Sequence, residues 1–181
     1  MVNNFSEDDI IVGMHSNWTY TPNKFILKNF LSNVYPYFKN SKVVKFLIVG
    51  KIETKVNLKN IVYTGWVKNI RSYVKLFDIG LVPIEAGAGI KSKVLDYMSV
   101  SKPMVITKIG AEGLKLTHNR NCLLSDAVDT QFRNDLSRLI ESSSLRMSLG
   151  ASAKKTFNEN YSLKKIIKDV NQLYLDTLKI K

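Results

Sequence analysis

The stretch DIGLVPIEAGAGIKSKVLDYMSVSKPMVIT, residues 78–107, contains a complete strand–helix–strand pattern. Residues 78–84 and 103–107 are short apolar runs with the length and composition of buried strands. Residues 92–100, which lie between them, are expected to form a helix. A strand, a helix and a second strand in so short a segment predict a βαβ unit with two parallel strands.

The same alternation extends through the N-terminal half of the chain. A polar loop and Thr21-Pro22 open an apolar-periodic stretch, which predicts a helix with Thr21 as N-cap and Pro22 at the first helical position. A short helix is expected at residues 71–77. Further strands are predicted at residues 10–14, 43–50, 60–67 and 122–124. This order predicts an α/β fold with a mostly parallel, doubly wound sheet.

The C-terminal third of the sequence turns helical, with helices expected at residues 131–142, 144–157 and 163–178. The last helix carries a broad apolar stripe. The stripe consists of Ile166, Ile167, Val170, Leu173, Tyr174 and Leu178. Two alternatives stay open: the stripe packs on the chain's own sheet, or it is covered by another protein segment or a second copy.

Composition limits the classes of protein to which this chain can belong. With 181 residues, 45% of them hydrophobic, and no linker rich in Gly, Pro or Ser, residues 1–181 are expected to form a single domain. Cys122 is the one cysteine and His15 and His118 are the two histidines, which excludes an intrachain disulfide and a zinc cluster. The polar N-terminus and the lack of a long apolar run favour a cytoplasmic protein.

Charge is the most unusual feature of the composition. The chain has 27 Lys and Arg against 15 Asp and Glu, a formal net charge of +12. Eleven of the basic residues lie between Lys24 and Lys75, where Glu53 is the one acid. This stretch is either an ordinary solvated surface or a basic face for polyanions, phosphorylated ligands or anionic lipid. The alternative function is therefore a binding module for nucleic acid or anionic membrane, with nucleic acid disfavoured because the lysines lack interleaved aromatic residues.

The loop between the strand and helix of the opening motif has the composition of an anion site. Gly87 and Gly89 allow the backbone to approach a ligand closely, and the following helix directs free N–H groups outward. Lys91 and Lys93 add two positive charges. The usual dinucleotide and P-loop fingerprints are absent, so the glycines alternatively serve only a tight turn.

Several motifs occur in a defined order. Gly13 is followed by Trp18 and Pro22-Asn23, and then by FLIVG, YTGWV, DIGLVPI, GAGIKSKVLDYMSVSKPMVIT and GAEGL. In this order they resemble the C-terminal, nucleotide-sugar-binding half of a two-domain, GT-B-type glycosyltransferase of group 1, which is family 4-like. The resemblance runs from about residue 10 to the end of the chain. It implies a Rossmann-like three-layer domain in which the glycine loop and the next helix hold the diphosphate of the sugar donor.

The resemblance also assigns roles by position. Asp96 falls where the family's ribose-binding acid lies, whereas Ala88 replaces the Glu expected eight residues earlier. For the leaving diphosphate, Lys91 is the first candidate and Lys93 the second. The implied diphosphate site comprises Gly87, Ala88, Gly89, Ile90, Lys91, Lys93, Gly13 and His15; the base site comprises Gly65, Trp66 and Val67; and the sugar site comprises Glu85, Gly110 and Glu112.

Simpler interpretations of single residues stay open beside these roles. A lone loop histidine such as His15 is more often a surface residue, and Asp96 is alternatively an ordinary exposed helix residue. Trp18 and Trp66 are most often packing residues, and Cys122 in an apolar strand is expected to be an inert core thiol.

The expected partners are a nucleotide-sugar donor, with UDP or GDP as the nucleotide, and an N-terminal acceptor-binding domain or partner subunit. The expected acceptor is a glycan or a lipid-linked molecule of polysaccharide biosynthesis. No cofactor or metal is expected. Because such enzymes use a second domain to bind the acceptor, the chain alone is expected to be catalytically incomplete. Peripheral association with the inner face of an anionic membrane is compatible with the basic stretch.

Overall fold

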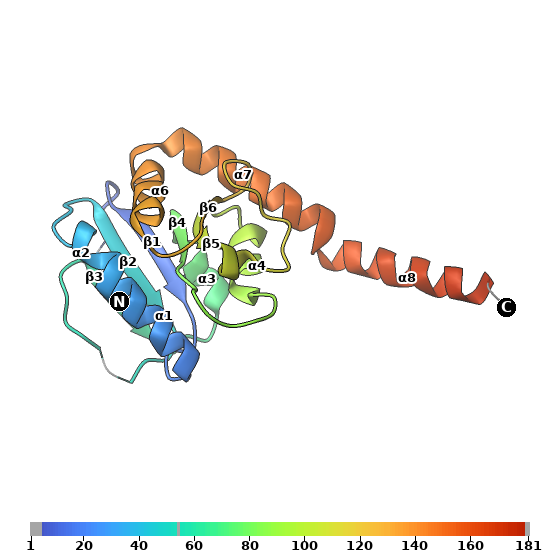
Figure 1. Ribbon diagram of the computed structural model, residues 1–181, viewed down its shortest axis with the longest axis horizontal. Helices are drawn as coiled ribbons and strands as arrows, with labels where there is room; N and C mark the ends of the chain where they lie inside the picture. The colour runs from blue at the N-terminus through green and yellow to red at the C-terminus, as the bar shows by residue number, and fades with distance from the viewer. Residues whose placement is uncertain (1–4, 54, 180–181) are drawn as a thin grey trace.

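Six parallel strands form one sheet in the computed structural model, which describes residues 5–53 and 55–179. Their order across the sheet is β3-β2-β1-β4-β5-β6, so β1 lies between β2 and β4 (Figure 1). The strands are β1 (Ile10–His15), β2 (Val44–Val49), β3 (Ile61–Gly65), β4 (Ile79–Val82), β5 (Met104–Thr107) and β6 (Leu123–Ser125). This arrangement confirms the predicted α/β, Rossmann-like fold.

Helices cover both faces of the sheet, which buries most of the apolar residues of its strands. Their bounds are α1 (Thr21–Asn33), α2 (Tyr35–Phe38), α3 (Ile70–Val74), α4 (Ser92–Ser99), α5 (Lys108–Ala111), α6 (Thr130–Glu141), α7 (Ser143–Asn160) and α8 (Leu163–Lys179). On one face, α1, α2 and α6 contribute Phe30, Tyr35 and Phe132 to a core cluster. On the other, α3 and α4 contribute Val74 and Tyr97 to a second cluster.

The helix boundaries depart from the expected ones in small ways. Tyr20, not Thr21, is the N-cap of α1, so Pro22 lies at the second helical position rather than the first. Two four-residue helices, α2 and α5, were not predicted because a single turn has too few residues to show a 3.6-residue period. α3 ends at Val74, earlier than the expected residue 77.

The last helix, α8, runs away from the body of the molecule (Figure 1). Its apolar stripe is largely exposed: Ile166 retains 48%, Leu173 67% and Tyr174 69% of its accessible surface. The alternative in which this stripe packs on the chain's own sheet is therefore wrong. Between residues 5 and 179, leaving out residue 54, no helix has the length and apolar character needed to cross a bilayer.

Candidate functional site

The carboxyl ends of β1 and β4 lie at the point where the strand order reverses, which is where ligands bind in open parallel sheets. A pocket of about 400 Å³ lies there. Its walls come from the loop after β1, the start of α1 and the segment between β4 and α4. The lining residues are Ser16, Tyr20, Pro22, Asn23, Ile26, Ile84, Ala86, Gly87, Ala88, Ile90, Lys91, Ser92 and Lys93.

The glycine loop between β4 and α4 has the backbone that the sequence suggested. Gly87 and Gly89 have φ values of +111° and +81°, a region that favours glycine. A Cβ atom at either position meets no atom within 4 Å, so conformation rather than crowding calls for glycine. The loop leads into α4, whose N-cap Lys91 makes no side-chain capping hydrogen bond. The N–H of Val94 donates to the backbone oxygen of Lys91 at 2.9 Å, so the N–H groups of Ser92 and Lys93 are the ones available to an anion.

Lys93 directs its ammonium toward the end of β1. Its Nζ donates a hydrogen bond to Ser16 Oγ at 3.2 Å and lies 5.9 Å from the centroid of the Trp18 ring. Burial, together with the charge of Lys91, lowers the pKa of Lys93 to about 8. Within the described part of the chain, Ser16 is the one hydrogen-bond partner of this ammonium, and it is neutral. A partly desolvated cation of this kind is a suitable ligand for a diphosphate.

Lys91 takes a different direction, although it is two residues away. Its Nζ donates to the backbone oxygens of Gly89 at 2.6 Å and Gly87 at 3.3 Å, and both hydrogen bonds are solvent-exposed. Lys91 thus closes its own loop, whereas Lys93 reaches the loop after β1.

His15 and Asp96 form a polar contact across the two elements. His15 ends β1 with its side chain 8% exposed, and its Nε2 lies 3.0 Å from Oδ2 of Asp96 on α4. The imidazole also packs edge-on against the Tyr97 ring, 5.3 Å between centroids. The interpretation of His15 as a surface residue is therefore wrong. His15 is also absent from the lining of the 400 Å³ pocket.

The residues expected at the nucleobase lie at a second pocket, of about 360 Å³, at the ends of β2 and β3. Gly65 ends β3 with a φ of +72°, and Trp66 and Val67 line this pocket together with Tyr63 and Tyr73. Trp66 is 73% exposed, so it is not a packing residue. Trp18, in contrast, is buried, and its Nε1 donates to the backbone oxygen of Val49 at 2.9 Å.

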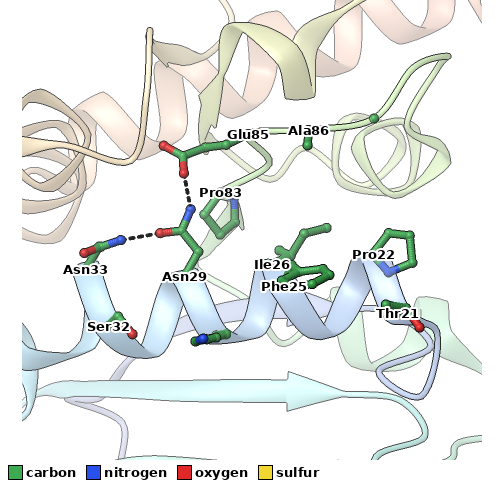
Figure 2. A pocket seen from close by; sticks show the side chains of 12 residues that line it. Thr21, Pro22, Phe25, Ile26, Asn29, Ser32, Asn33, Pro83, Glu85 and Ala86 are labelled. Carbon is green, nitrogen blue, oxygen red and sulfur yellow. Dashed lines mark hydrogen bonds between the residues drawn. The ribbon is translucent and has the colours of Figure 1, made fainter.

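Glu85, expected at the sugar, lies apart from the lysines. Its Oε1 accepts from the backbone N–H of Val128 at 2.7 Å, and its Oε2 accepts from Asn29 Nδ2 at 2.6 Å. Figure 2 shows this carboxylate at the polar end of a pocket of about 540 Å³ that runs along α1. Both oxygens are thus used to join α1 to the segment before α6.

Two other predicted site residues, Gly13 and Gly110, lie in closely packed parts of the fold. Gly13 lies within β1 rather than in the following loop, and a Cβ there would come within 2.1 Å of the Phe77 ring. Gly110 is buried in α5, where its N–H donates to Thr107 Oγ1 at 3.1 Å.

The segment after α5 closes one side of the glycine loop. A Cβ added at Gly113 would come within 3.0 Å of the Ile90 side chain, so Gly113 lies against the end of the glycine loop. Glu112, the C-cap of α5, is exposed in the same segment.

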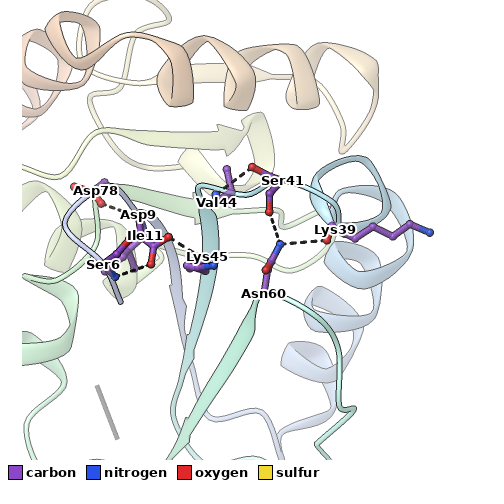
Figure 3. A network of polar contacts seen from close by, with 9 residues as sticks. All are labelled: Ser6, Asp9, Ile11, Lys39, Ser41, Val44, Lys45, Asn60 and Asp78. Atoms are coloured by element: carbon purple, nitrogen blue, oxygen red, sulfur yellow. Dashed lines mark hydrogen bonds and ion pairs between the residues drawn. The ribbon is translucent and has the colours of Figure 1, made fainter. Parts of the chain in front are cut away.

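The opposite, amino end of the sheet has polar side chains that satisfy one another (Figure 3). Asp9 accepts from the backbone N–H of Ser6 at 2.8 Å and lies 3.6 Å from Lys45 Nζ, and Asp78 accepts from the backbone N–H of Ile11 at 2.8 Å. These contacts hold strand starts together. Because these polar groups already have partners, the carboxyl end of the sheet is the candidate binding edge.

Cys122 is a free cysteine in the hydrophobic core. Burial raises the pKa of the Cys122 thiol to about 12, as expected for an inert core thiol. Within residues 5–53 and 55–179, no three His, Cys, Asp or Glu side chains gather as metal ligands would.

Eight lining residues of the 400 Å³ pocket were missed from the sequence, and Ser16, Tyr20 and Asn23 are three of them. The sequence did place these three in a loop after a strand and at a helix start, which is the position where parallel sheets present ligand contacts. Their polar side chains had no charge or glycine pattern to single them out.

Comparison with known proteins gives both a family and a fold. Residues 10–142 match the family described as glycosyl transferases, group 1. No curated protein matches the sequence. Among solved structures, a mutant of S. aureus TarM in complex with fondaparinux, alpha-GlcNAc-glycerol and UDP superposes with a TM-score of 0.75 at 18% identity, over 96% of this chain and 38% of TarM.

Two further structures have the same fold. Anabaena HepE in complex with UDP superposes with a TM-score of 0.72 at 17% identity, over 96% of this chain and 50% of HepE. The C-terminal domain of LpcC, a group 1 family glycosyl transferase from Francisella tularensis, superposes with a TM-score of 0.66 at 17% identity, over 89% of this chain and 90% of that domain.

The chain thus spans half or less of the length of TarM and HepE, and it corresponds in extent to the isolated C-terminal domain of LpcC. The family match covers more than half of the chain. The chain belongs to the group 1 glycosyltransferases and has the fold of their C-terminal half.

Proposed function

We propose that this chain binds the nucleoside diphosphate sugar that serves as donor in a glycosyl transfer. The observation that carries the proposal is the pocket at the β1–β4 crevice, where Lys93 and the uncapped start of α4 converge. Both features favour a diphosphate, because an ammonium and free N–H groups stabilise negative charge. UDP in the HepE and TarM complexes supports a uridine nucleotide.

The sheet order suggests how the donor extends across the edge. The diphosphate lies at the 400 Å³ pocket, and the base lies at the pocket of Trp66 and Val67 beyond β1. Asp96, on the helix that follows the glycine loop, takes the ribose hydroxyls. The sugar faces residues 110–113, of which Gly113 lies next to Ile90 of the glycine loop.

Chemically, transfer breaks the bond between the anomeric carbon of the sugar and an oxygen of the diphosphate. The electron pair of this bond stays on the diphosphate, which leaves with additional negative charge. The oxygen of an acceptor hydroxyl forms the new bond, and its proton passes to the leaving diphosphate or to water. Lys93 and the N–H groups of α4 stabilise that charge as it develops. We rank Lys93 above Lys91, the reverse of the order expected from the sequence, because Lys91 is engaged with its own loop.

The acceptor, a glycan or a lipid-linked molecule, is held by an N-terminal half or a partner subunit. The exposed stripe of α8 is a contact surface for that half, since soluble proteins rarely leave so long an apolar stripe uncovered. The chain alone therefore binds the donor without transferring its sugar.

The alternative of a basic binding module has weaker support. Lys24 pairs with Glu53 at 2.9 Å and Lys45 with Asp9 at 3.6 Å, so part of the basic stretch is neutralised. Association with anionic vesicles, if present, should weaken steeply as salt rises, whereas nucleotide binding should respond far less.

The proposed function is tested by titrating the chain with UDP, GDP, ADP, TDP and CMP in a calorimeter and by thermal shift. We expect at least one nucleoside diphosphate, with UDP first, to bind and to raise the melting temperature at millimolar concentration. CMP, which has one phosphate, should bind more weakly. If none of the five changes the melting temperature or produces heat, the donor site is refuted.

A further inference from the structure

We propose that His15 is a positioning residue: its imidazole fixes the carboxylate of Asp96 in the orientation that receives the donor ribose. The proposal rests on the proposed function and assigns His15 a role distinct from diphosphate binding. It is carried by one contact, His15 Nε2 to Asp96 Oδ2 at 3.0 Å, between residues that are 81 positions apart in the sequence.

Asp96 needs such a partner because its side chain is 44% exposed. An aspartate on a helix surface samples several rotamers, and ordering it on ligand binding costs entropy. His15 is buried at the end of β1 and its ring packs against Tyr97, so the imidazole is held rigidly. A fixed donor on one carboxylate oxygen restricts the other oxygen as well.

The surroundings of the imidazole indicate which nitrogen holds the proton. Nδ1 is buried and has no hydrogen-bond partner among the residues that the structure describes. A buried N–H without an acceptor is costlier than an unused lone pair, so the proton belongs on Nε2, which donates it to Asp96. Oδ1 of Asp96 makes no hydrogen bond within the same residues and is available to the ribose hydroxyls.

The same geometry argues against a direct contact of His15 with phosphate. Nε2 already faces a carboxylate and Nδ1 is enclosed. His15 does not line the 400 Å³ pocket, and the void that it shares with Lys93 is too small for a water molecule. β1 lies between β2, at the pocket of Trp66, and β4, at the pocket of Lys93. His15 therefore supports Asp96 between the two pockets, at the place that a ribose occupies between a base and a diphosphate.

Two substitutions of His15 separate its roles. In His15→Gln, the side-chain amide nitrogen takes the place of Nε2 and keeps a donor for Asp96. In His15→Asn, the shorter amide cannot reach Asp96. His15→Leu, which fills the space without a donor, replaces the Asn variant if that variant fails to fold, as judged by thermal unfolding.

The measurement compares the affinities of the whole chain for UDP and for 2′,3′-dideoxy-UDP, which lacks both ribose hydroxyls. We expect wild type to prefer UDP, this preference to fall about tenfold in His15→Asn, and His15→Gln to restore most of it. Asp96→Ala should abolish the preference, and adding His15→Asn to it should change nothing further. Lys93→Met is the matched control, because it should weaken both ligands equally.

The remaining outcomes distinguish the two proposals. If wild type prefers UDP and His15→Asn keeps that preference, the positioning role is overturned while the proposed function stands. If His15→Asn weakens both nucleotides by the same factor, His15 acts on the diphosphate instead, which also overturns it. If wild type binds neither nucleotide, the proposed function itself fails.

Discussion

Replacing Lys93 with methionine should change stability and ligand affinity in opposite directions. Methionine keeps the apolar stem of the lysine and removes the ammonium that donates to Ser16 Oγ. If that ammonium contacts the diphosphate, its loss removes a hydrogen bond to a charged group, worth about 1.5–3 kcal/mol. Affinity for UDP should then fall about 10- to 150-fold.

The free energy of unfolding should rise in Lys93→Met, because burying the charged ammonium costs free energy in the folded protein. The pKa of Lys93 is lowered from 10.5 to about 8, so between these values the unfolded chain binds more protons than the folded chain. The free energy of unfolding of the wild type should therefore increase as pH rises through that window, by at most about 1.4 kcal/mol per pH unit. In Lys93→Met this contribution should vanish.

Calorimetric titration with UDP at pH 7 and denaturant unfolding at pH 7 and pH 10 measure both effects. Lys91→Met is the control, since Lys91 closes its own loop and should affect UDP affinity less than Lys93. Equal affinity of wild type and Lys93→Met for UDP would refute the reasoning. So would a larger loss from Lys91→Met, which would restore the ranking expected from the sequence.

Other contacts in the structure lead to three more expectations. In wild type, UDP affinity should decline as pH rises above about 8, because Lys93 loses its proton. Calorimetric titrations from pH 7 to 10 measure this, and an affinity that does not change with pH would contradict it. Glu85→Ala should lower stability by about 1 kcal/mol, through the lost contacts with Asn29 and Val128, and leave UDP affinity unchanged; a selective loss of UDP-sugar binding would instead support a sugar contact. Sedimentation at several concentrations should show self-association that Leu173→Lys weakens, and a strict monomer would argue against α8 as a contact surface.

The fold was predictable from the sequence because its strands are short apolar runs bounded by glycine or polar loops. Residues 78–107 form the expected β4, α4 and β5, and a parallel sheet collects the loops that follow its strands at one edge. The positive φ values of Gly87 and Gly89 are compatible with the tight turn that was one interpretation of the same pattern. These features depend on residues that are close together in the chain.

The details of the site were harder to predict from the sequence, because they depend on contacts between residues that are far apart in the chain. The pairing of His15 with Asp96 joins a strand end to a helix 81 residues later, and no local pattern encodes it. The different directions of Lys91 and Lys93 follow from the helix start and the position of Ser16. The exposure of α8 was equally hidden, because an amphipathic period shows that a face is apolar but not what covers it.

A crystal structure of the chain in complex with UDP tests the donor site most directly. We expect the diphosphate against Lys93 and the first N–H groups of α4, the ribose hydroxyls on Asp96, and the uracil beside Trp66 and Val67. UDP bound elsewhere, for instance in the pocket along α1 beside Glu85, with the β1–β4 crevice empty, would contradict the donor site.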